Sequence, residues 1–357
     1  MVSFSLCMIV KNEEEVLRRC LQSTKNLFDE IIIVDTGSTD KTKEIAKEFT
    51  DKVYDFTWQD DFALARNYSL SFASCDFVMW LDADDVITSK NLKKLLKLKQ
   101  RLTLNTDVVM LKYAISFENN KSTFSFFRER IFNRLKNFQF EGFVHEVVSP
   151  FGNILYEDIE IEHRKIKANS PKRNLKIYEK HIKNGEVLSP RHKFYYAREL
   201  YFNGIFTKSI KVFKDFLKEK YSFIENKIEA CLMLSKCYLE KGDFESGLKI
   251  LMQSFIYDVP RAEICCEIGY IFRLCKNFSK AIYWYEVALK IKPNYTSGAF
   301  IQEDCYNFIP HIELCVCYYY LGDYNKAYYH NLKAKNFKPN HESVLNNDKF
   351  LKKFITK

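Results

Sequence analysis

Small residues recur at regular offsets through the carboxyl-terminal half of the chain. In the copy that starts at residue 262, the small positions are Gly269, Ala281 and Ala288, and Pro293 follows the last of them. Further copies with similar offsets start at residues 190, 228 and 308, with insertions in the first and third units. A unit of about 34 residues that forms two helices cannot bury its apolar faces alone, so neighbouring units must stack on it. Residues 189–340 are therefore predicted to form an all-α solenoid.

This pattern resembles the tetratricopeptide (TPR) repeat. The concave side of such a solenoid usually binds peptide segments. The resemblance implies that the repeats bind a peptide or protein, or else a second subunit, which would make the protein a homodimer. Aromatic residues at helical spacing more often pack inward, so most rings of this half are expected in the core. The candidates for a binding platform are Tyr195, Tyr196, Tyr201, Tyr318, Tyr319 and Tyr320.

The amino-terminal half alternates between short apolar runs and segments with helical spacing. An apolar run closed by a polar turn is typical of a buried parallel strand, and the first such run is Phe4–Val10. The alternation predicts right-handed βαβ units around a mainly parallel, Rossmann-like sheet. The expected strands are residues 4–10, 30–35, 53–56 and 77–81, and the expected helices are residues 13–24, 61–73 and one that ends at Phe49.

The fourth expected strand runs directly into three carboxylates, Asp82, Asp84 and Asp85. Open α/β sheets bind ligands at the carboxyl ends of their strands. Asp82 and Asp84 are two residues apart, so in an extended segment their side chains point the same way. Two oxygen ligands on one face suit Mg²⁺ or Mn²⁺. A plain acidic turn is the alternative, because Asp is common in turns.

This half has no glycine loop for phosphates. Neither G-x-G-x-x-G nor G-x-x-x-x-G-K-[ST] follows the first strand, which excludes the common dinucleotide and P-loop sites. If a nucleotide binds here, a metal at the acidic strand end must neutralise its phosphates. The ends of the first two strands would then offer Val10, Lys11, Asn12 and Asp35 to the base and the ribose.

Composition narrows the class of protein. The chain has 357 residues, is 47% hydrophobic and 28% charged, and carries a formal net charge of +9, as a folded protein with room for two domains does. Its lysines are scattered without a block of like charge, and no nucleic-acid partner is expected. The 11 cysteines mostly lie in apolar helical patterns, which indicates buried, reduced thiols. The apolar opening is too short to cross a bilayer, so a cytoplasmic protein without a transmembrane segment is expected.

Several stretches of the amino-terminal half resemble family 2 glycosyltransferases of the GT-A fold. They follow the family's order within residues 5–85: SLCMIVKNEE, EIIIVDTGSTDKT, DFALARN and WLDADD. The resemblance implies that Asp35 hydrogen-bonds the uracil of a UDP-sugar and that Arg66 lies near the base or the diphosphate. It also implies that Asp82 lies near the ribose and that Asp84 coordinates the metal. The structural alternatives are that Asp35 caps the next helix and that Arg66 pairs with Asp61.

From Asp107 onward the pattern changes to strands with interleaved charges. Residues 108–111, 124–132 and 138–148 are expected to form antiparallel strands with one wet face. Displacing UDP with inversion requires a base that takes the acceptor proton. Glu146 lies among apolar neighbours, where desolvation raises a carboxyl pKa toward neutrality, and it is our first candidate. An exposed strand residue is the alternative, and His145 would face the other side of the strand.

A narrower resemblance covers residues 132–146 together with His163. The run from Gly142 to Glu146 is similar to the G-x-V-H-E element of bacterial core-oligosaccharide glucosyltransferases and sublancin-type peptide S-glycosyltransferases. In that subgroup the His-Glu pair belongs to the active site. The wider family carries Glu-Asp or Asp-Asp at the base position, so His145, Glu146 and His163 stay open as base or metal ligand. From the residues alone, His163 is either a metal ligand or a partner of Glu162.

Together these patterns predict a GT-A domain at residues 1–165, a linker at 166–188 with a helix over Arg173–Lys183, repeats at 189–340 and a tail at 341–357. The expected activity is inverting, metal-dependent transfer of a hexose from a UDP-sugar, with UDP-glucose as the expected donor, to a Cys, Ser or Thr side chain of a peptide. A cell-surface oligosaccharide acceptor is the first alternative. A non-catalytic TPR scaffold is the second.

Overall fold

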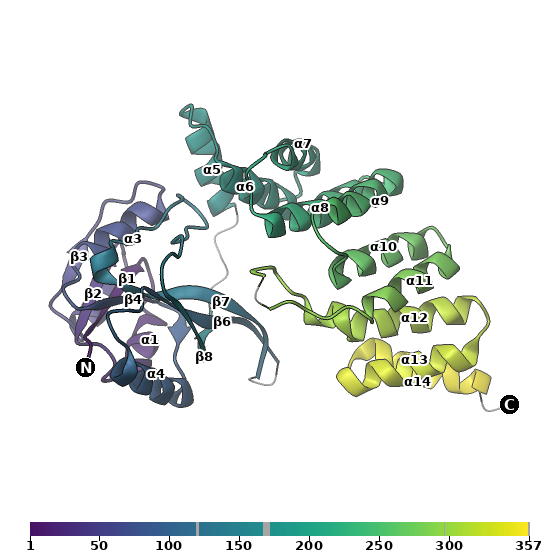
Figure 1. Ribbon diagram of the computed structural model, residues 1–357, viewed down its shortest axis with the longest axis horizontal. Coiled ribbons are helices and arrows are strands. Elements are labelled where there is room, and N and C mark those ends of the chain that lie inside the picture. The colour runs from purple at the N-terminus through teal and green to yellow at the C-terminus, as the bar shows by residue number, and fades with distance from the viewer. Residues whose placement is uncertain (119–120, 167–171, 296, 356–357) are drawn as a thin grey trace. The chain divides into compact units, whose positions relative to one another are not determined.

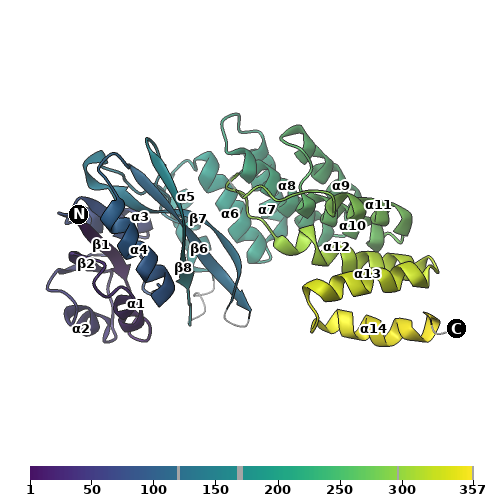
Figure 2. The same ribbon diagram turned by 60° about the horizontal axis from the view of Figure 1, so that its bottom comes forward.

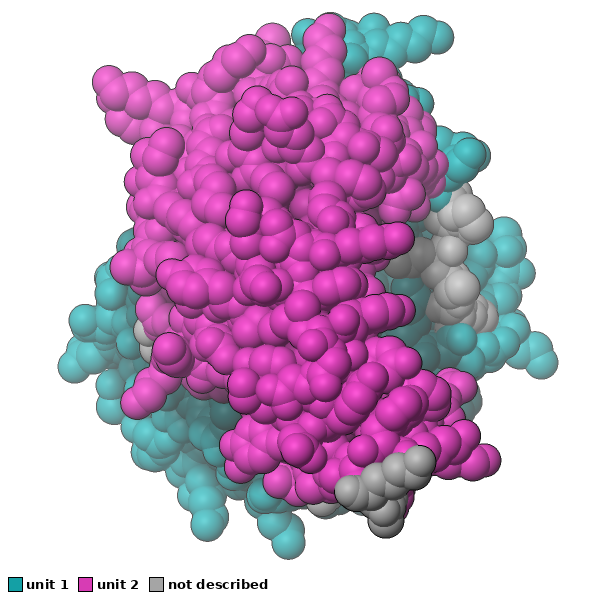
Figure 3. Space-filling view, turned by 90° about the vertical axis from the view of Figure 1, so that its right-hand side faces the viewer, with its two compact units in different colours: residues 1–186 teal, residues 187–357 magenta. Residues whose placement is uncertain are grey.

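The structure, a computed structural model, describes residues 1–118, 121–166, 172–295 and 297–355. These divide into two compact units, Met1–Glu186 and Val187–Lys357, which have different colours in Figure 3. Residues 167–171 of the predicted linker and 356–357 of the predicted tail lie outside the described residues. The predicted boundaries at residues 165, 188 and 340 stay predictions.

Unit 1 contains one mixed sheet of eight strands in the order β3-β2-β1-β4-β7-β6-β8-β5. β1, β2, β3 and β4 are mutually parallel, as predicted, and β7 runs antiparallel to β4. The carboxyl ends of β1, β2 and β4 therefore meet at one edge. The strands are β1 Phe4–Val10, β2 Glu30–Asp35, β3 Val53–Asp55, β4 Phe77–Trp80, β5 Asp85–Val86, β6 Val108–Glu118, β7 Lys121–Asn133 and β8 Ile154–His163.

Helices cover both faces of this sheet. Leu6 and Met8 of β1 pack into one core cluster with α1 and α4, whereas Cys7 packs on the opposite face near α3. Figure 1 shows α1 and α4 on one side of the sheet and α3 on the other. The α/β prediction is confirmed, although the first helix is shorter than predicted. The helices are α1 Leu17–Ser23, α2 Thr42–Lys47, α3 Phe62–Leu70, α4 Ser89–Arg101, the 3₁₀ turn η1 Arg134–Lys136, and α5 Arg173–Lys183.

The predicted strand at residues 138–148 is wrong. Within this segment the structure has a single isolated β-bridge, between Glu141 and Val147. Gly142 and His145 adopt φ values of 100° and 55°, so the chain turns through the left-handed region instead of extending. The apolar residues that suggested a strand, such as Phe140, pack on Trp80 instead. The segment is a loop that we call the 138–148 loop.

In the part of unit 2 that the structure describes, the regular elements are all helices. The predicted copies at residues 190, 262 and 308 begin where α6, α10 and α12 begin, and the copy at 228 lies just inside α8. Figures 1 and 2 show consecutive helices of this unit stacked side by side, so the predicted solenoid is confirmed. The helices are α6 Pro190–Phe202, α7 Phe206–Leu217, α8 Ile224–Leu239, α9 Phe244–Gln253, η2 Ser254–Ile256, α10 Ala262–Leu274, α11 Phe278–Ala288, η3 Glu303–Tyr306, α12 Phe308–Tyr320, α13 Tyr324–Phe337 and α14 Glu342–Ile355.

The predicted environment of the thiols and aromatic rings is borne out in part. All 11 cysteines are free, and most are buried. Tyr195 and Tyr196 lie in the core of unit 2, whereas Tyr320 is 62% exposed.

None of the helices in the described parts of the chain combines the length and the apolar character needed to cross a membrane.

Candidate active site

A cavity of about 570 Å³ opens at the carboxyl edge of β1 and β4. All of its lining residues belong to unit 1. Among the site residues predicted from the sequence, the structure brings together Val10, Lys11, Asn12, Arg66, Asp82, Asp84, His145, Glu146 and His163 around this cavity. Asp35 is the exception, because it is buried and is not one of the residues that line the cavity.

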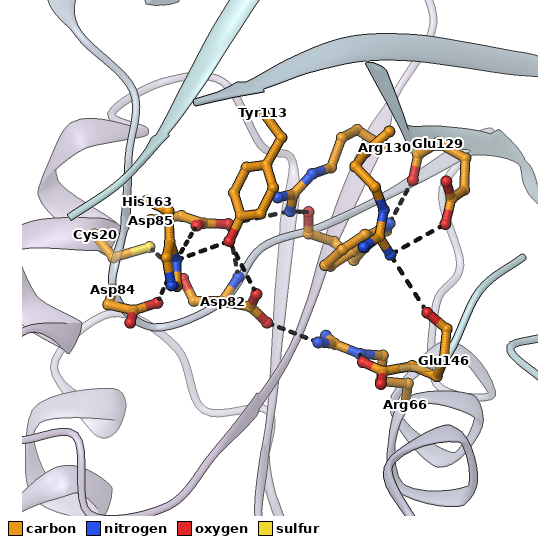
Figure 4. A network of polar contacts seen from close by, with 12 residues as sticks. Cys20, Arg66, Asp82, Asp84, Asp85, Tyr113, Glu129, Arg130, Glu146 and His163 are labelled. Atoms are coloured by element: carbon orange, nitrogen blue, oxygen red, sulfur yellow. Dashed lines mark hydrogen bonds and ion pairs between the residues drawn. The ribbon is translucent and has the colours of Figure 1, made fainter. Parts of the chain in front are cut away.

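The acidic turn after β4 folds back onto β8. The Asp85 backbone N–H donates to the Asp82 carbonyl at 3.0 Å, and the Asp82 N–H donates to the Asp85 carboxylate at 3.0 Å. Asp85 opens β5, which pairs with β8 at His163. This pairing brings an imidazole from residue 163 against three carboxylates, and Asp82, Asp84, Asp85 and His163 each offer one ligand atom within 4.8 Å of the others. Figure 4 shows this acidic cluster.

His163 is held by carboxylates and a phenol. Its Nδ1 lies 3.1 Å from Asp84 Oδ1, 3.3 Å from Asp85 Oδ1 and 2.7 Å from the Tyr113 hydroxyl. Burial alone would lower the pKa of His163, but the two carboxylates more than offset burial and raise it to about 10. The alternative partner Glu162 is wrong, because Glu162 accepts a hydrogen bond from Arg164.

Arg130 of β7 supports the acidic turn from below. It is fully buried, and its Nη1 donates to Asp85 Oδ2 at 3.0 Å and to the Trp80 carbonyl at 3.1 Å. Its guanidinium lies 3.8 Å from the Trp80 ring centroid and 4.2 Å from that of Tyr113. The predicted wet face of this strand is therefore wrong at Arg130, because the charge is balanced by a buried carboxylate.

Arg66 of α3 joins the acidic turn to the 138–148 loop. The residue is only 6% exposed, its Nη2 donates to Asp82 Oδ1 and its Nε to Glu146 Oε1, both at 2.7 Å. Burial alone would raise the pKa of Asp82, but Arg66 and Arg130 hold it well below its usual range. The alternative pairing with Asp61 is wrong, because Asp61 caps α3 by accepting from the Leu64 N–H.

His145 and Glu146 both line the cavity. The predicted alternation across a strand is wrong here, since the left-handed φ of His145 turns the backbone between the two side chains. The predicted apolar setting of Glu146 is also wrong. Its carboxylate is paired with Arg66, and Arg128 Nη2 donates to its backbone carbonyl at 3.4 Å.

Asp35 ends β2 and is 2% exposed. Its Oδ2 accepts hydrogen bonds from the Gly37 and Ser38 backbone N–H groups at 3.0 and 2.9 Å. Its Oδ1 is buried without a hydrogen-bond partner among the described residues. A buried acceptor of this kind is costly unless a ligand or water supplies a donor.

The acidic cluster has the donor set of a divalent cation site. Carboxylate oxygens suit Mg²⁺ or Mn²⁺, and the imidazole nitrogen favours a transition metal such as Mn²⁺ over Mg²⁺. Asp85 Oδ2 is already bonded to Arg130 and to the Asp82 N–H. Asp84, His163 and one oxygen each of Asp82 and Asp85 are the atoms that fit a cation.

The sequence model of the protein family glycosyl transferase family 2 matches residues 5–158. This range includes β2 to β4, nearly all of β1, the acidic turn and the 138–148 loop. Residues 5–158 form a family 2 glycosyltransferase domain. A tetratricopeptide repeat model matches residues 262–295, the α10/α11 pair of unit 2.

Two relatives match different lengths of the chain. The SPbeta prophage-derived glycosyltransferase SunS of Bacillus subtilis is 26% identical over 279 residues, covering 74% of this chain and 64% of its own. A TPR repeat-containing protein of Synechococcus elongatus is 48% identical over 85 residues, covering 24% of this chain and 21% of its own. The chain thus spans less than two thirds of either relative. Among solved structures, a TPR protein of Thermus thermophilus aligns over 50% of this chain and 89% of its own, with 17% identity and a TM-score of 0.37.

Sequence reasoning missed several residues of the glycosyltransferase domain that line the cavity or support it. Tyr113 and Arg128 line it, and Arg130 lies beneath the acidic turn. One signal was available, since Arg128 and Arg130 are two apart on a strand and so lie on one face. Nothing in the local sequence pattern shows that this face of the strand contacts carboxylates rather than water. Lys165, the last residue of the predicted GT-A domain, and Asn174, from the predicted linker, also line the cavity.

Proposed function

We propose that the chain is an inverting, metal-dependent glycosyltransferase. It moves a hexose from a UDP-sugar to a Cys, Ser or Thr side chain of a peptide or protein acceptor. The observation that carries this proposal is the Arg66 bridge, which joins Asp82 of the acidic cluster to Glu146 inside one cavity. The groups to which we assign donor binding and proton transfer would therefore lie within reach of one substrate pair, as an in-line displacement requires.

The donor half of the proposal rests on the acidic cluster and on Asp35. Asp84 and His163 would hold Mg²⁺ or Mn²⁺ together with Asp82, and the bound cation would neutralise the diphosphate as it leaves. Asp35 Oδ1, buried without a partner among the described residues, supports a base that donates an N–H, as uracil does. Val10 pairs with Asp35 in the sheet, and Val10, Lys11 and Asn12 lie at the cavity wall. UDP-glucose is the donor that we propose.

The acceptor half rests on the 138–148 loop. Glu146 would accept the proton of the attacking hydroxyl or thiol, while Arg66 fixes the carboxylate in place. A thiol, with a pKa of about 8.5, loses its proton to a weaker base than a hydroxyl does. His145 lies beside Glu146 at the cavity wall and would contact the acceptor.

The repeats favour a peptide acceptor over a free sugar, because helical solenoids offer extended surfaces to peptide segments. The alternative is that the same surface of the repeats binds a second copy of the chain and forms a homodimer. The free cysteines fit a reducing, cytoplasmic environment. A scaffold without activity would not need the ion-paired carboxylates of the cavity.

The test is mass spectrometry of candidate peptides incubated with the protein, Mn²⁺ and a panel of UDP-sugars. The Asp84→Ala variant should lose transfer and UDP release, because the cation loses a ligand. The matched control is Asp158→Ala, which removes an exposed carboxylate of the same domain outside the cavity. Unchanged UDP release by Asp84→Ala would remove Asp84 from the site.

The Glu146→Gln variant separates binding from proton transfer. It should keep UDP affinity and lower the transfer rate by about 100-fold or more. Glu141→Gln in the same loop is the control, since Glu141 is exposed. Loss of UDP binding in Glu146→Gln would instead assign Glu146 a structural role.

A further inference from the structure

The 138–148 loop is held largely by contacts with other elements. Within it, one isolated bridge joins Glu141 and Val147, and between these residues Gly142 and His145 adopt left-handed backbone angles. A non-glycine residue in that region costs free energy and persists only where its surroundings impose it. The position of His145 and Glu146 therefore depends on contacts from outside the loop.

One set of contacts comes from α3. The Asn67 side chain donates to the Phe140 carbonyl at 2.9 Å and accepts from the Phe140 N–H at 2.8 Å. The Phe62 N–H, at the first residue of α3, donates to the Phe143 carbonyl at 3.0 Å. These bonds fix the backbone of the loop before Val144, but none of them holds the Phe143 side chain.

The second set comes from α5 and holds that side chain. The Phe143 ring stacks on the His181 imidazole, with ring centroids 3.9 Å apart and planes 6° from parallel. The fully buried Tyr178 meets the same ring edge-on at 5.1 Å. Phe143 is 7% exposed as a result. A ring fixed from two directions, two residues before His145, limits the conformations open to the loop.

His181 is itself fixed in its ring plane. Its Nε2 donates to the Asp60 carbonyl at 3.1 Å, and its Nδ1 lies 2.7 Å from the Glu186 carboxylate. Lys180, the preceding residue of α5, forms an ion pair with the Asp60 side chain. The imidazole thus connects the segment before α3, the last residue of unit 1 and the Phe143 ring.

We propose that His181 is a positioning residue for the 138–148 loop, acting through Phe143 and together with the direct Arg66 ion pair to hold Glu146 where it can accept the acceptor proton. The expected effect of His181 on the transfer rate rests on the proposed function, whereas its expected effect on the conformation of the loop does not. α5 is then part of the active site rather than a linker, and Asn174 from its first turn lines the same cavity.

The test uses the full chain and two readouts. In His181→Ala, backbone amides of residues 138–148 should exchange with deuterium about threefold to tenfold faster, as expected for loss of one aromatic stack. His181→Phe keeps a ring and should restore slow exchange. Lys176→Ala, an exposed residue on the same helix, is the control and should exchange like the wild type. Phe143→Leu removes the stack from the other side and serves if His181→Ala does not fold.

The second readout is kinetic. Transfer by His181→Ala should show kcat about 10-fold to 100-fold lower, because small misplacements of a catalytic group are costly. Its affinity for UDP with Mn²⁺ should stay within about twofold, since no residue of the acidic cluster is touched. Unchanged exchange of residues 138–148 in His181→Ala would overturn the proposal, as would a parallel loss of UDP affinity. If exchange responds as expected but the wild type transfers no sugar, the proposed function fails and the positioning role stands.

Discussion

Arg130 and Asp85 form a fully buried ion pair beneath the acidic turn. Replacing Arg130 by an uncharged residue leaves the buried Asp85 carboxylate without its charge partner, which costs about 3–5 kcal/mol of folding free energy. We expect Arg130→Met to lower the free energy of unfolding of unit 1 by this amount, measured by urea titration with fluorescence.

The control for this prediction is Arg18→Met. Arg18 pairs with Glu48 on the surface, where the side chains are 45% and 48% exposed. Exposed pairs contribute little, so this variant should unfold close to the wild type. An equally small effect of Arg130→Met would mean that Asp85 finds another partner.

Glu30 gives a prediction for pH. Burial alone would raise the pKa of Glu30, but hydrogen bonds from Lys52, Ser5 and Ser74 lower it to about 2. A carboxyl whose folded pKa lies below its unfolded value of about 4.3 stabilises the fold above that value. This stability is lost as the pH falls toward 2.

We therefore expect Glu30→Gln to be less stable than the wild type at neutral pH. The difference in the free energy of unfolding should shrink as the pH falls from about 4.5 toward 2. Urea titrations at a series of pH values measure it. A difference that stays constant across this range would assign the effect to packing rather than to charge.

At the scale of elements, the solenoid depends on small residues where paired helices cross. A Cβ added at Gly269 of α10 would lie 2.9 Å from the Tyr285 ring of α11, and that ring is fully buried. Overpacking of this kind costs about 1–3 kcal/mol, which outweighs the roughly 1 kcal/mol that alanine gains in a helix.

Gly269→Ala should therefore destabilise unit 2 in urea or thermal unfolding. Gly247→Ala is the matched control, because there the added Cβ meets the end of the flexible Leu239 side chain at 2.8 Å. The control should lose less stability than Gly269→Ala. The reverse order would mean that the Tyr285 ring can move aside.

At the same scale, the 138–148 loop shows that a run of apolar residues can suggest a strand where none forms. Its apolar residues suggested a strand, and most of those side chains are indeed buried, although Val147 is only partly buried. They are buried by packing on Trp80, α3 and α5, which leaves the backbone free to turn at Gly142 and His145.

At the scale of the whole molecule, we expect unit 1 to bind the donor and the repeats of unit 2 to bind the peptide acceptor. Each residue that lines the cavity lies in residues 1–186. If the fragment 1–186 folds, it should bind UDP with Mn²⁺ and hydrolyse the donor like the full chain, while transfer to a peptide falls because the repeats are missing. Circular dichroism, calorimetry and mass spectrometry measure folding, binding and transfer. Equal loss of hydrolysis and transfer in a folded fragment would show that the repeats do not serve the acceptor.

The sequence by itself determined the local structure and its layout. Apolar runs of strand length, helical spacing and repeated small residues reflect contacts between neighbours along the chain, and these placed β1 to β4, α5 and the repeats. The same logic put the carboxylates of the acidic turn at the carboxyl edge of the sheet, because parallel strands end together.

Only the tertiary structure decided which charges meet. Arg66 and Glu146 are 80 residues apart in the chain, and Arg130 reaches Asp85 across the sheet. No local pattern encodes such pairs, since a buried charge accepts whichever partner the fold brings within reach. The turn at His145 was decided in the same way, by rings and hydrogen bonds from α3 and α5 that hold a backbone conformation the loop would not adopt alone.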